Sequence, residues 1–299
     1  MRPVAAIVVM LAVARLAPAA AEPASKVDLA QAKTLLPGGE ACEAVACVID
    51  HAYRADPEAK ALARTLWTAH GSVAGLGLDE VMDGGYRGKI HLVPELPTGR
   101  YRTHLARVVR AMASIDQFFA TLFADQPAPR YRWQGVAFRF ARSLGKRTPS
   151  AYANGWTIAY NVAGSLLTSA AGVHETVVHE LFHSNDGAHG DWSATHLQAE
   201  YDAIVTRCRR ARPSCLAPYA PNSTMVRGGT YYAFQPNNGN GVHEYAAELA
   251  VRYVKEQREM LDTGKLARRA FKCGPPANGR AWQALVDEFF AGRDLVPKC

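Results

Sequence analysis

The clearest pattern of apolar and polar positions lies between Gly99 and Pro129. Apolar residues recur there every three or four positions, which places them on one face of a helix. They are Leu105, Val108, Val109, Met112, Ile115, Phe118, Phe119 and Leu122. The sequence PAP follows them as a turn signal. The pattern therefore predicts a long helix with its apolar face on a core.

Two segments after this helix alternate between apolar and polar residues with a period of two. They are WQGVAFRFAR at 133–142 and GWTIAYNVAG at 155–164. Such alternation is typical of strands, because successive side chains point to opposite faces of a sheet. A third strand is predicted at Lys89–Val93, between a glycine and a proline.

The second half of the chain is predicted to be mainly helical. Helical spacing recurs at 172–185, 191–210, 243–261 and 279–292. Asp186 and Gly187 are expected to end the first of these helices. A polar stretch rich in glycine and proline, 211–241, predicts a long loop, and two earlier helices are predicted within 21–37 and 57–71. We therefore expect an α+β fold: a small mixed sheet with a backing helix, followed by a mainly helical C-terminal lobe.

The first 21 residues have the features of a secretory signal peptide. A positive charge near the start precedes an apolar run, Val4–Val13, and small residues surround Ala19 and Ala21. Arg15 interrupts the apolar run, whereas spanning a bilayer needs about 20 apolar residues. We expect cleavage after Ala21 and an exported protein, periplasmic or extracellular, with no integral membrane segment.

The six cysteines form three pairs of neighbours along the chain. These pairs are Cys42 with Cys47, Cys208 with Cys215, and Cys273 with Cys299. An even number of cysteines behind a signal peptide indicates disulfides in an oxidising compartment. Six cysteines allow fifteen connectivities, and we predict pairing between neighbours. A cysteine zinc site is disfavoured, because the chain has no C-x-x-C pair.

Composition and charge exclude several classes of protein. The chain has 299 residues, of which 48% are hydrophobic and 20% are charged, as in ordinary globular proteins. The formal net charge is +7, but the basic residues are scattered and form no recognisable nucleic-acid module. We therefore expect no nucleic-acid partner, and we expect a monomer.

The sequence HELFH, at 179–183, has the H-E-x-x-H pattern of metal-binding helices. His179 and His183 lie one helical turn apart, so both imidazoles can reach one metal ion. Glu180 is rotated by about 100° from His179, beside the metal, where it could take a proton from metal-bound water. The apolar face on the far side of the helix consists of Val177, Val178 and Leu181.

Two residues compete for the role of third ligand. His189 fits the spacing of the extended pattern H-E-x-x-H-x-x-G-x-x-H, although Asp186 occupies its glycine position. Glu244 lies one turn before Glu248 on a predicted alanine-rich helix, where one carboxylate could bind metal and the other could hold a ligand histidine. An acidic surface that is paired with basic residues is the alternative for that helix. His243 is a weaker candidate for contact with metal or substrate.

The order of elements over 99–185 resembles that of the zincin metallopeptidases: long helix, strand, strand, and a helix with HELFH. The sequence EYAAELA resembles the glutamate-zincin helix of the anthrax lethal factor group and related bacterial peptidases. This resemblance implies that Glu244 is the third ligand and that Glu248 supports the ligands from behind. It also implies that the strand WTIAYN pairs with extended substrate. Residues 99–299 would form the peptidase domain, and 22–98 would belong to its upper lobe.

The function implied is that of a secreted metallopeptidase with one catalytic Zn²⁺ in a cleft between the two lobes. Glu180 would assist water in hydrolysing a peptide bond of a peptide or protein substrate. Tyr231 or Tyr232 could stabilise the oxyanion, and His174 would be structural. The alternatives are a zincin-like module that binds zinc or a protein without proteolysis, and a surface-binding protein in which HELFH is incidental.

Overall fold

The computed structural model describes residues 26–84, 87–208, 212–226, 229–235 and 241–299. The predicted signal peptide, 1–21, lies outside the described residues. The elements of the first half are α1 (Leu29–Leu35), α2 (Val45–Ala52), α3 (Pro57–His70), β1 (Val73–Leu76), β2 (Glu80–Asp83), β3 (Lys89–Pro94), α4 (Arg102–Leu122), β4 (Ala137–Ser143), β5 (Ala151–Asn154) and β6 (Thr157–Asn161). Those of the second half are α5 (Ala170–Ala188), α6 (Trp192–His196), α7 (Gln198–Arg207), α8 (Pro213–Leu216), α9 (Gly241–Thr263) and α10 (Pro276–Phe289). The fold is mixed α/β, with a helical C-terminal part.

The six described strands form one mixed sheet in the order β2-β3-β4-β6-β5, and β1 also pairs with β4. β4 runs parallel to β1 and β6 and antiparallel to β3. β6, which is the predicted strand WTIAYN, is hydrogen-bonded to β4 on one side and to β5 on the other. The prediction that this strand pairs with substrate is therefore wrong, because both of its edges are taken. The outer edge of the sheet belongs to β5.

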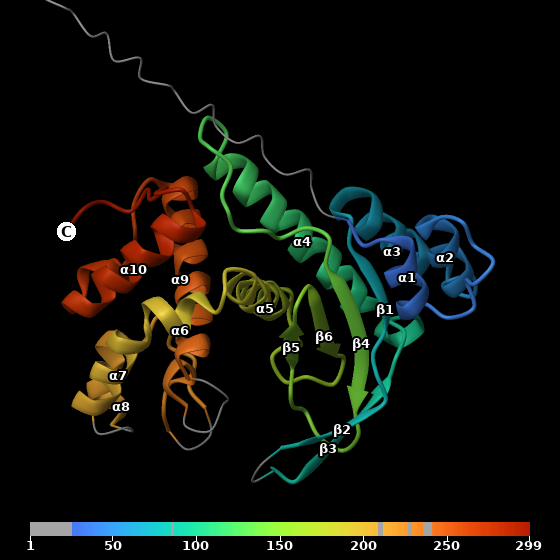
Figure 1. The fold of residues 1–299 in the computed structure, drawn as a ribbon, viewed down its shortest axis with the longest axis horizontal. Helices are drawn as coiled ribbons and strands as arrows, with labels where there is room; N and C mark the ends of the chain where they lie inside the picture. Colours follow the sequence, from blue (N-terminus) through green and yellow to red (C-terminus); the bar gives the residue numbers. More distant parts are fainter. Residues whose placement is uncertain (1–25, 85–86, 209–211, 227–228, 236–240) are drawn as a thin grey trace, which may run out of the picture.

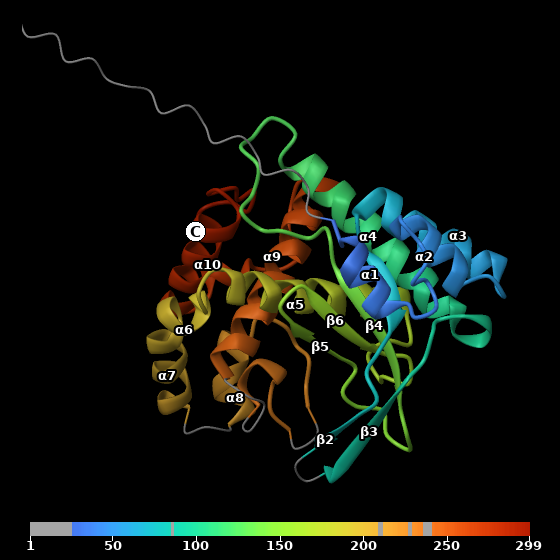
Figure 2. The same cartoon turned by 45° about the vertical axis from the view of Figure 1, so that its right-hand side comes forward.

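Helix α5 lies at the centre of the molecule, between the sheet and α9 (Figure 1). α4 packs on α3 and on α5, and α9 packs on the other side of α5. Turned by 45°, the view shows α1 to α3 on the sheet side and α6, α7 and α10 beyond α9 (Figure 2). The central helix is thus held between a sheet-containing part and a helical part.

The N-terminal segment is built into the sheet. β1, β2 and β3 all come from residues 22–98, and β1 and β3 pair with β4. The backbone N–H of Val27 donates to the Gly71 carbonyl over 2.8 Å, and the Tyr53 hydroxyl donates to the Ala74 carbonyl over 3.0 Å. The described residues of this segment, 26–84 and 87–98, therefore extend the sheet on the β4 side.

The central helix runs three residues further than the sequence predicts. Asp186 was expected to end it, but its carboxylate accepts hydrogen bonds from the backbone N–H of Ser193 at 2.7 Å and from the Ser193 hydroxyl at 2.6 Å. The chain turns instead at Gly190, with φ of 73°, and Asp191, with φ of 54°. The carboxylate that could have capped a turn locally is used to join α5 to α6.

Two other predictions for the second half need correction. The helix predicted over 191–210 is broken at Leu197 into α6 and α7, and its last residues lie outside the described chain. The long loop predicted over 211–241 contains α8, a 3-10 turn at Ala217–Tyr219 and another at Tyr232–Phe234. Short turns stabilised by tertiary packing leave little periodicity in a sequence.

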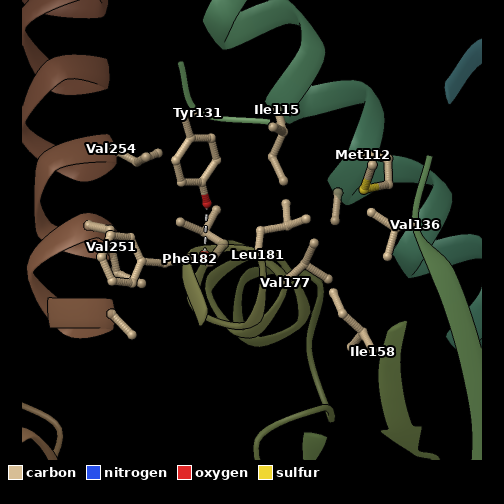
Figure 3. Packing of buried hydrophobic residues seen from close by; sticks show 14 of the residues in the cluster. Met112, Ile115, Tyr131, Val136, Ile158, Val177, Leu181, Phe182, Val251 and Val254 are labelled. Atoms are coloured by element: carbon tan, nitrogen blue, oxygen red, sulfur yellow. Dashed lines mark hydrogen bonds between the residues drawn. The ribbon is translucent and has the colours of Figure 1, made fainter. Parts of the chain in front are cut away.

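The core packs tightly around α5. Figure 3 shows side chains of α4, α5 and α9 meeting there, among them Met112, Ile115, Val177, Leu181, Phe182, Val251 and Val254. The Tyr131 hydroxyl donates to the Val178 carbonyl over 3.1 Å. The apolar face predicted for this helix is therefore buried, which fixes the direction in which its polar face points.

Three disulfides join the cysteines as predicted. The pairs are Cys42–Cys47, Cys208–Cys215 and Cys273–Cys299. No helix within the described ranges is long and apolar enough to cross a bilayer. The three disulfides are compatible with an oxidising compartment.

Candidate metal centre

Helices α5 and α9 bring three potential metal ligands together. The ligand atoms of His179, His183 and Glu244 all lie within 4.8 Å of one another. The Nε2 atom of His179 lies 3.1 Å from Nε2 of His183 and 3.1 Å from Oε2 of Glu244, and His183 Nε2 lies 3.8 Å from that oxygen. This group of two imidazoles and one carboxylate could hold a metal ion.

The close approach of the two helices comes from small residues on α9. The side chains of Ala246, Ala247 and Ala250 are completely buried, and α9 packs along α5. Because residues four apart share one face of a helix, Glu244 and Glu248 both point toward α5 from this interface. The alanines let α9 come near enough for its carboxylates to reach the histidines.

Glu248 supports His179 from the side opposite to the cluster. Its Oε1 lies 3.3 Å from Nδ1 of His179, and both side chains are about nine-tenths buried. A carboxylate on Nδ1 favours a proton on that nitrogen and leaves Nε2 directed at the cluster.

Glu180 lies beside the cluster and is not among its three ligands. Its side chain is buried, with 6% of the residue exposed. Burial raises the pKa of the Glu180 carboxyl, while the nearby His179 and His183 and a hydrogen bond from the backbone of Ala153 act in the opposite direction. A buried carboxylate with a raised pKa can accept and return a proton near neutral pH.

Without a metal ion, His179 and Glu244 form a buried ion pair. Burial acts to lower the pKa of His179, but its hydrogen bonds to Glu244 and Glu248 outweigh this and raise that pKa well above its usual value. Burial acts to raise the pKa of Glu244, and its hydrogen bonds to His179 and His183 lower that pKa below its ordinary range. A metal ion would take the place of the shared proton, since it binds the deprotonated imidazole.

His189 lies away from the three clustered ligands. Its Nδ1 is 2.7 Å from Oε1 of Glu288 on α10, and its ring packs on Phe289 with 4.8 Å between centroids. His174 is also elsewhere, with Nε2 3.4 Å from the Arg258 guanidinium. Burial and the nearby Arg258 lower the pKa of His174 to about 4. Both histidines tie helices together.

The structure separates the two tyrosines that precede α9. The ring of Tyr232 packs against that of His179 in an edge-to-face arrangement, with 5.7 Å between centroids, and Tyr232 lines the cleft described next. Tyr231 forms a backbone bridge with Met225 and is not among the lining residues. His243 lines the same cleft, and its buried Nε2 has no hydrogen-bond partner in the described chain.

The cluster lies in a cleft of about 730 Å³. Residues 148–153 and 165–166 line it from the sheet side, and 224–226, Tyr232 and α9 line it from the helical side. Helix α5 contributes residues from Gly172 to Gly187 along its length. The cleft predicted between the two parts of the chain is therefore present.

Sequence reasoning missed β5, the strand along this cleft. Its signal was available: Gly155 and Trp156 stand between two alternating segments, and glycine at the first central position is typical of a two-residue hairpin turn. Gly155 has a φ of 55°, as such a turn requires, and β5 pairs with β6 across it.

No family model matches this chain, and neither a curated protein nor a solved structure matches it. The chemistry of the cleft must therefore be inferred from its own residues.

Proposed function

We propose that this chain is an exported zinc-dependent metallopeptidase of the glutamate-zincin type. The observation that carries the proposal is the meeting of His179, His183 and Glu244 in a cleft, with Glu180 buried beside them. A metal site retained only for structure has no need of a fourth, acidic group next to its ligands. The order α4, β4, β5, β6, α5 contains the long helix, the two predicted strands and the HELFH helix in the order on which the resemblance rests, with β5 as an additional strand.

The ligand set favours zinc. Two imidazoles and one carboxylate are a known set for catalytic zinc, which leaves a fourth position for water or substrate. When bound, zinc supplies a Lewis acid that makes water more acidic and polarises a carbonyl group.

The residues of the chain supply the rest of the reaction. Glu180 takes a proton from the water that attacks the peptide carbonyl and passes it to the leaving amine. Glu248 holds the imidazole of His179 in position through Nδ1. Tyr232, whose ring packs edge-to-face against His179, is the residue we assign to stabilising the oxyanion.

The edge of β5 provides a place for an extended polypeptide. β5 pairs with β6 on one side, and no other described strand pairs with its outer edge. Ala151 and Ala153 of this strand line the cleft, and the backbone of Ala153 donates a hydrogen bond to Glu180. A peptide can add to such an edge as a further strand, held by main-chain hydrogen bonds. This arrangement brings a backbone carbonyl near the metal without demanding a particular sequence.

The decisive experiment is the substitution Glu180→Gln. We expect the wild-type chain to cleave an unfolded protein in a reaction that a chelator stops. We expect Glu180→Gln to lose cleavage while it retains one zinc ion per chain, measured by elemental analysis. Full activity in that variant would refute the mechanism, and an absence of bound metal in the wild type would refute the whole proposal.

The third ligand is tested by two matched variants. Glu244→Ala should lose bound zinc, whereas His189→Ala should retain it, because His189 is bonded to Glu288 outside the cluster. Zinc loss in the second variant alone would overturn the assignment of Glu244.

A further inference from the structure

We propose that Leu166 forms an apolar subsite that binds a large apolar side chain on the C-terminal side of the cleaved bond. That the ligand is a polypeptide rests on the proposed function. The subsite itself rests on the exposure, anchoring and position of Leu166, and these are independent of any metal.

Large apolar side chains are exposed at few places in the described chain. They are Leu78, Val81, Leu144, Leu166 and Met225. Leu166 and Met225 both line the cleft, Leu166 from the sheet side and Met225 from the helical side. Leu166 is 51% exposed. A ligand that covers apolar surface exposed to water inside a cleft removes this surface from water, which makes the free energy of binding more favourable.

The exposure of Leu166 is fixed by its backbone. Its N–H donates to the Ser150 hydroxyl over 3.1 Å. A Cβ atom at position 172 would lie 2.2 Å from the Leu166 carbonyl oxygen. Only glycine at this position therefore allows the loop to lie so close to α5. The next residue, Leu167, is fully buried, and its carbonyl accepts a hydrogen bond from Arg107 over 3.0 Å. Of two consecutive leucines, one is held in the core and the other in the cleft.

The contact with Gly172 gives the distance from the metal centre. Gly172 precedes His179 by seven residues on α5, which is about 10 Å along a helix. An extended chain covers that length in about three residues. Leu166 therefore lies within reach of the first three residues on one side of the cleaved bond.

The direction of β5 decides which side this is. Ser150, just before β5, touches Leu166 near the start of α5, whereas Ala153 lies at Glu180 further along the helix. β5 and α5 thus run in the same direction. A peptide that adds antiparallel to β5, the more stable pairing, runs from the end of α5 toward its start. Its residues after the cleaved bond then pass Leu166.

The test uses a set of peptides that carry leucine or serine at each of the three positions after one fixed cleavage site. For the wild type we expect a preference for leucine of about tenfold in kcat/KM at one of these positions. We expect Leu166→Ser to lose it. Leu144→Ser is the matched control, because Leu144 is 41% exposed but lies outside the cleft, and it should retain the preference.

Binding to the Glu180→Gln variant, measured by fluorescence anisotropy, separates the subsite from catalysis. We expect the leucine peptide to bind about tenfold more tightly than the serine peptide, and the added substitution Leu166→Ser to remove the difference. Equal affinities, or a preference that survives Leu166→Ser, would overturn the subsite. A second set of peptides varies the three positions before the cleavage site, and a preference for leucine there, with none after the cleaved bond, would overturn the subsite as well. If the leucine peptide binds more tightly than the serine peptide but the wild type cleaves neither, the proposed function is overturned and the apolar subsite is supported.

Discussion

Replacing Glu248 by glutamine tests whether the cluster is organised as a metal site. The carboxylate of Glu248 lies 3.3 Å from Nδ1 of His179 and is nearly buried. Glutamine has almost the same shape, and its amide oxygen can still accept the Nδ1 proton. The substitution therefore removes the negative charge and little else.

The expected loss follows from the strength of that hydrogen bond. A hydrogen bond to a charged group contributes about 1.5–3 kcal/mol, and a neutral one about 0.5–1.5 kcal/mol. The ranges differ at their midpoints by roughly 1.25 kcal/mol, which corresponds to about an eightfold weaker zinc affinity. This is close to the lower end of the losses of about 10–100-fold that are typical when a group behind a metal ligand is changed.

Zinc Kd would be measured by competition with a chromogenic chelator at pH 7. Glu175→Gln is the matched control: Glu175 lies on α5 and lines the same cleft, but it pairs with Lys255. We expect Glu175→Gln to leave Kd unchanged and both variants to unfold at the temperature of the wild type within a few degrees.

Two results would refute this reasoning. An unchanged Kd in Glu248→Gln would mean that the carboxylate does not prepare His179 for metal. A loss as large as that of Glu244→Ala would mean that Glu248 is itself a ligand.

Four further predictions concern protons and stability. Because the pKa of His179 is raised well above 6.5, zinc binding at pH 7 should release about one proton, measured by calorimetry in buffers of different ionisation enthalpy; no release would contradict the ion pair. In the metal-free chain, the stabilisation of the fold by protonated His179 is lost as the pH rises through the raised pKa of this residue. The stabilisation by ionised Glu244 is lost in the opposite direction, as the pH falls below 4.5 toward the lowered pKa of this residue. Urea unfolding should therefore show the pair's contribution as largest between about pH 4.5 and 6.5, and Glu244→Gln should remove this maximum. Leu181→Ala, at a fully buried position of α5, should lower the free energy of unfolding by about 2–5 kcal/mol, and a change below 1 kcal/mol would contradict the packing in Figure 3. Replacing Cys273 and Cys299 by serine opens a loop of 26 residues and should lower the free energy of unfolding by about 3.5 kcal/mol; an unchanged urea midpoint would contradict it.

Helices and strands with a strong period were predictable from the sequence. The apolar stripe of α4 and the strands β3, β4 and β6 lie where the pattern places them. The short strands β1 and β2, with four residues each, and the helix α2 were missed. Elements of one or two turns, or four residues, contain too few positions for a period to stand out, and neighbouring strands and helices stabilise them.

The predicted end of α5 was wrong because the side chain expected to stop the helix has a partner on the next helix. The sequence NDG is a stop signal by itself, yet Asp186 is bonded to Ser193, and the helix continues. A residue such as aspartate ends a helix when its side chain bonds to the neighbouring backbone, and it loses this effect when the side chain bonds to another element.

The sequence alone determined which residues could share a helical face. His179 with His183, and Glu244 with Glu248, are pairs four apart, and α-helical geometry aligns such pairs wherever the helix lies. Only the tertiary structure decided that Glu244 meets the histidines while His189 turns to Glu288. It also decided that β5, and not β6, borders the cleft. Glu244 lies 65 residues from His179, and its approach depends on how the buried faces of α5 and α9 pack, a property that no local period in the sequence contains.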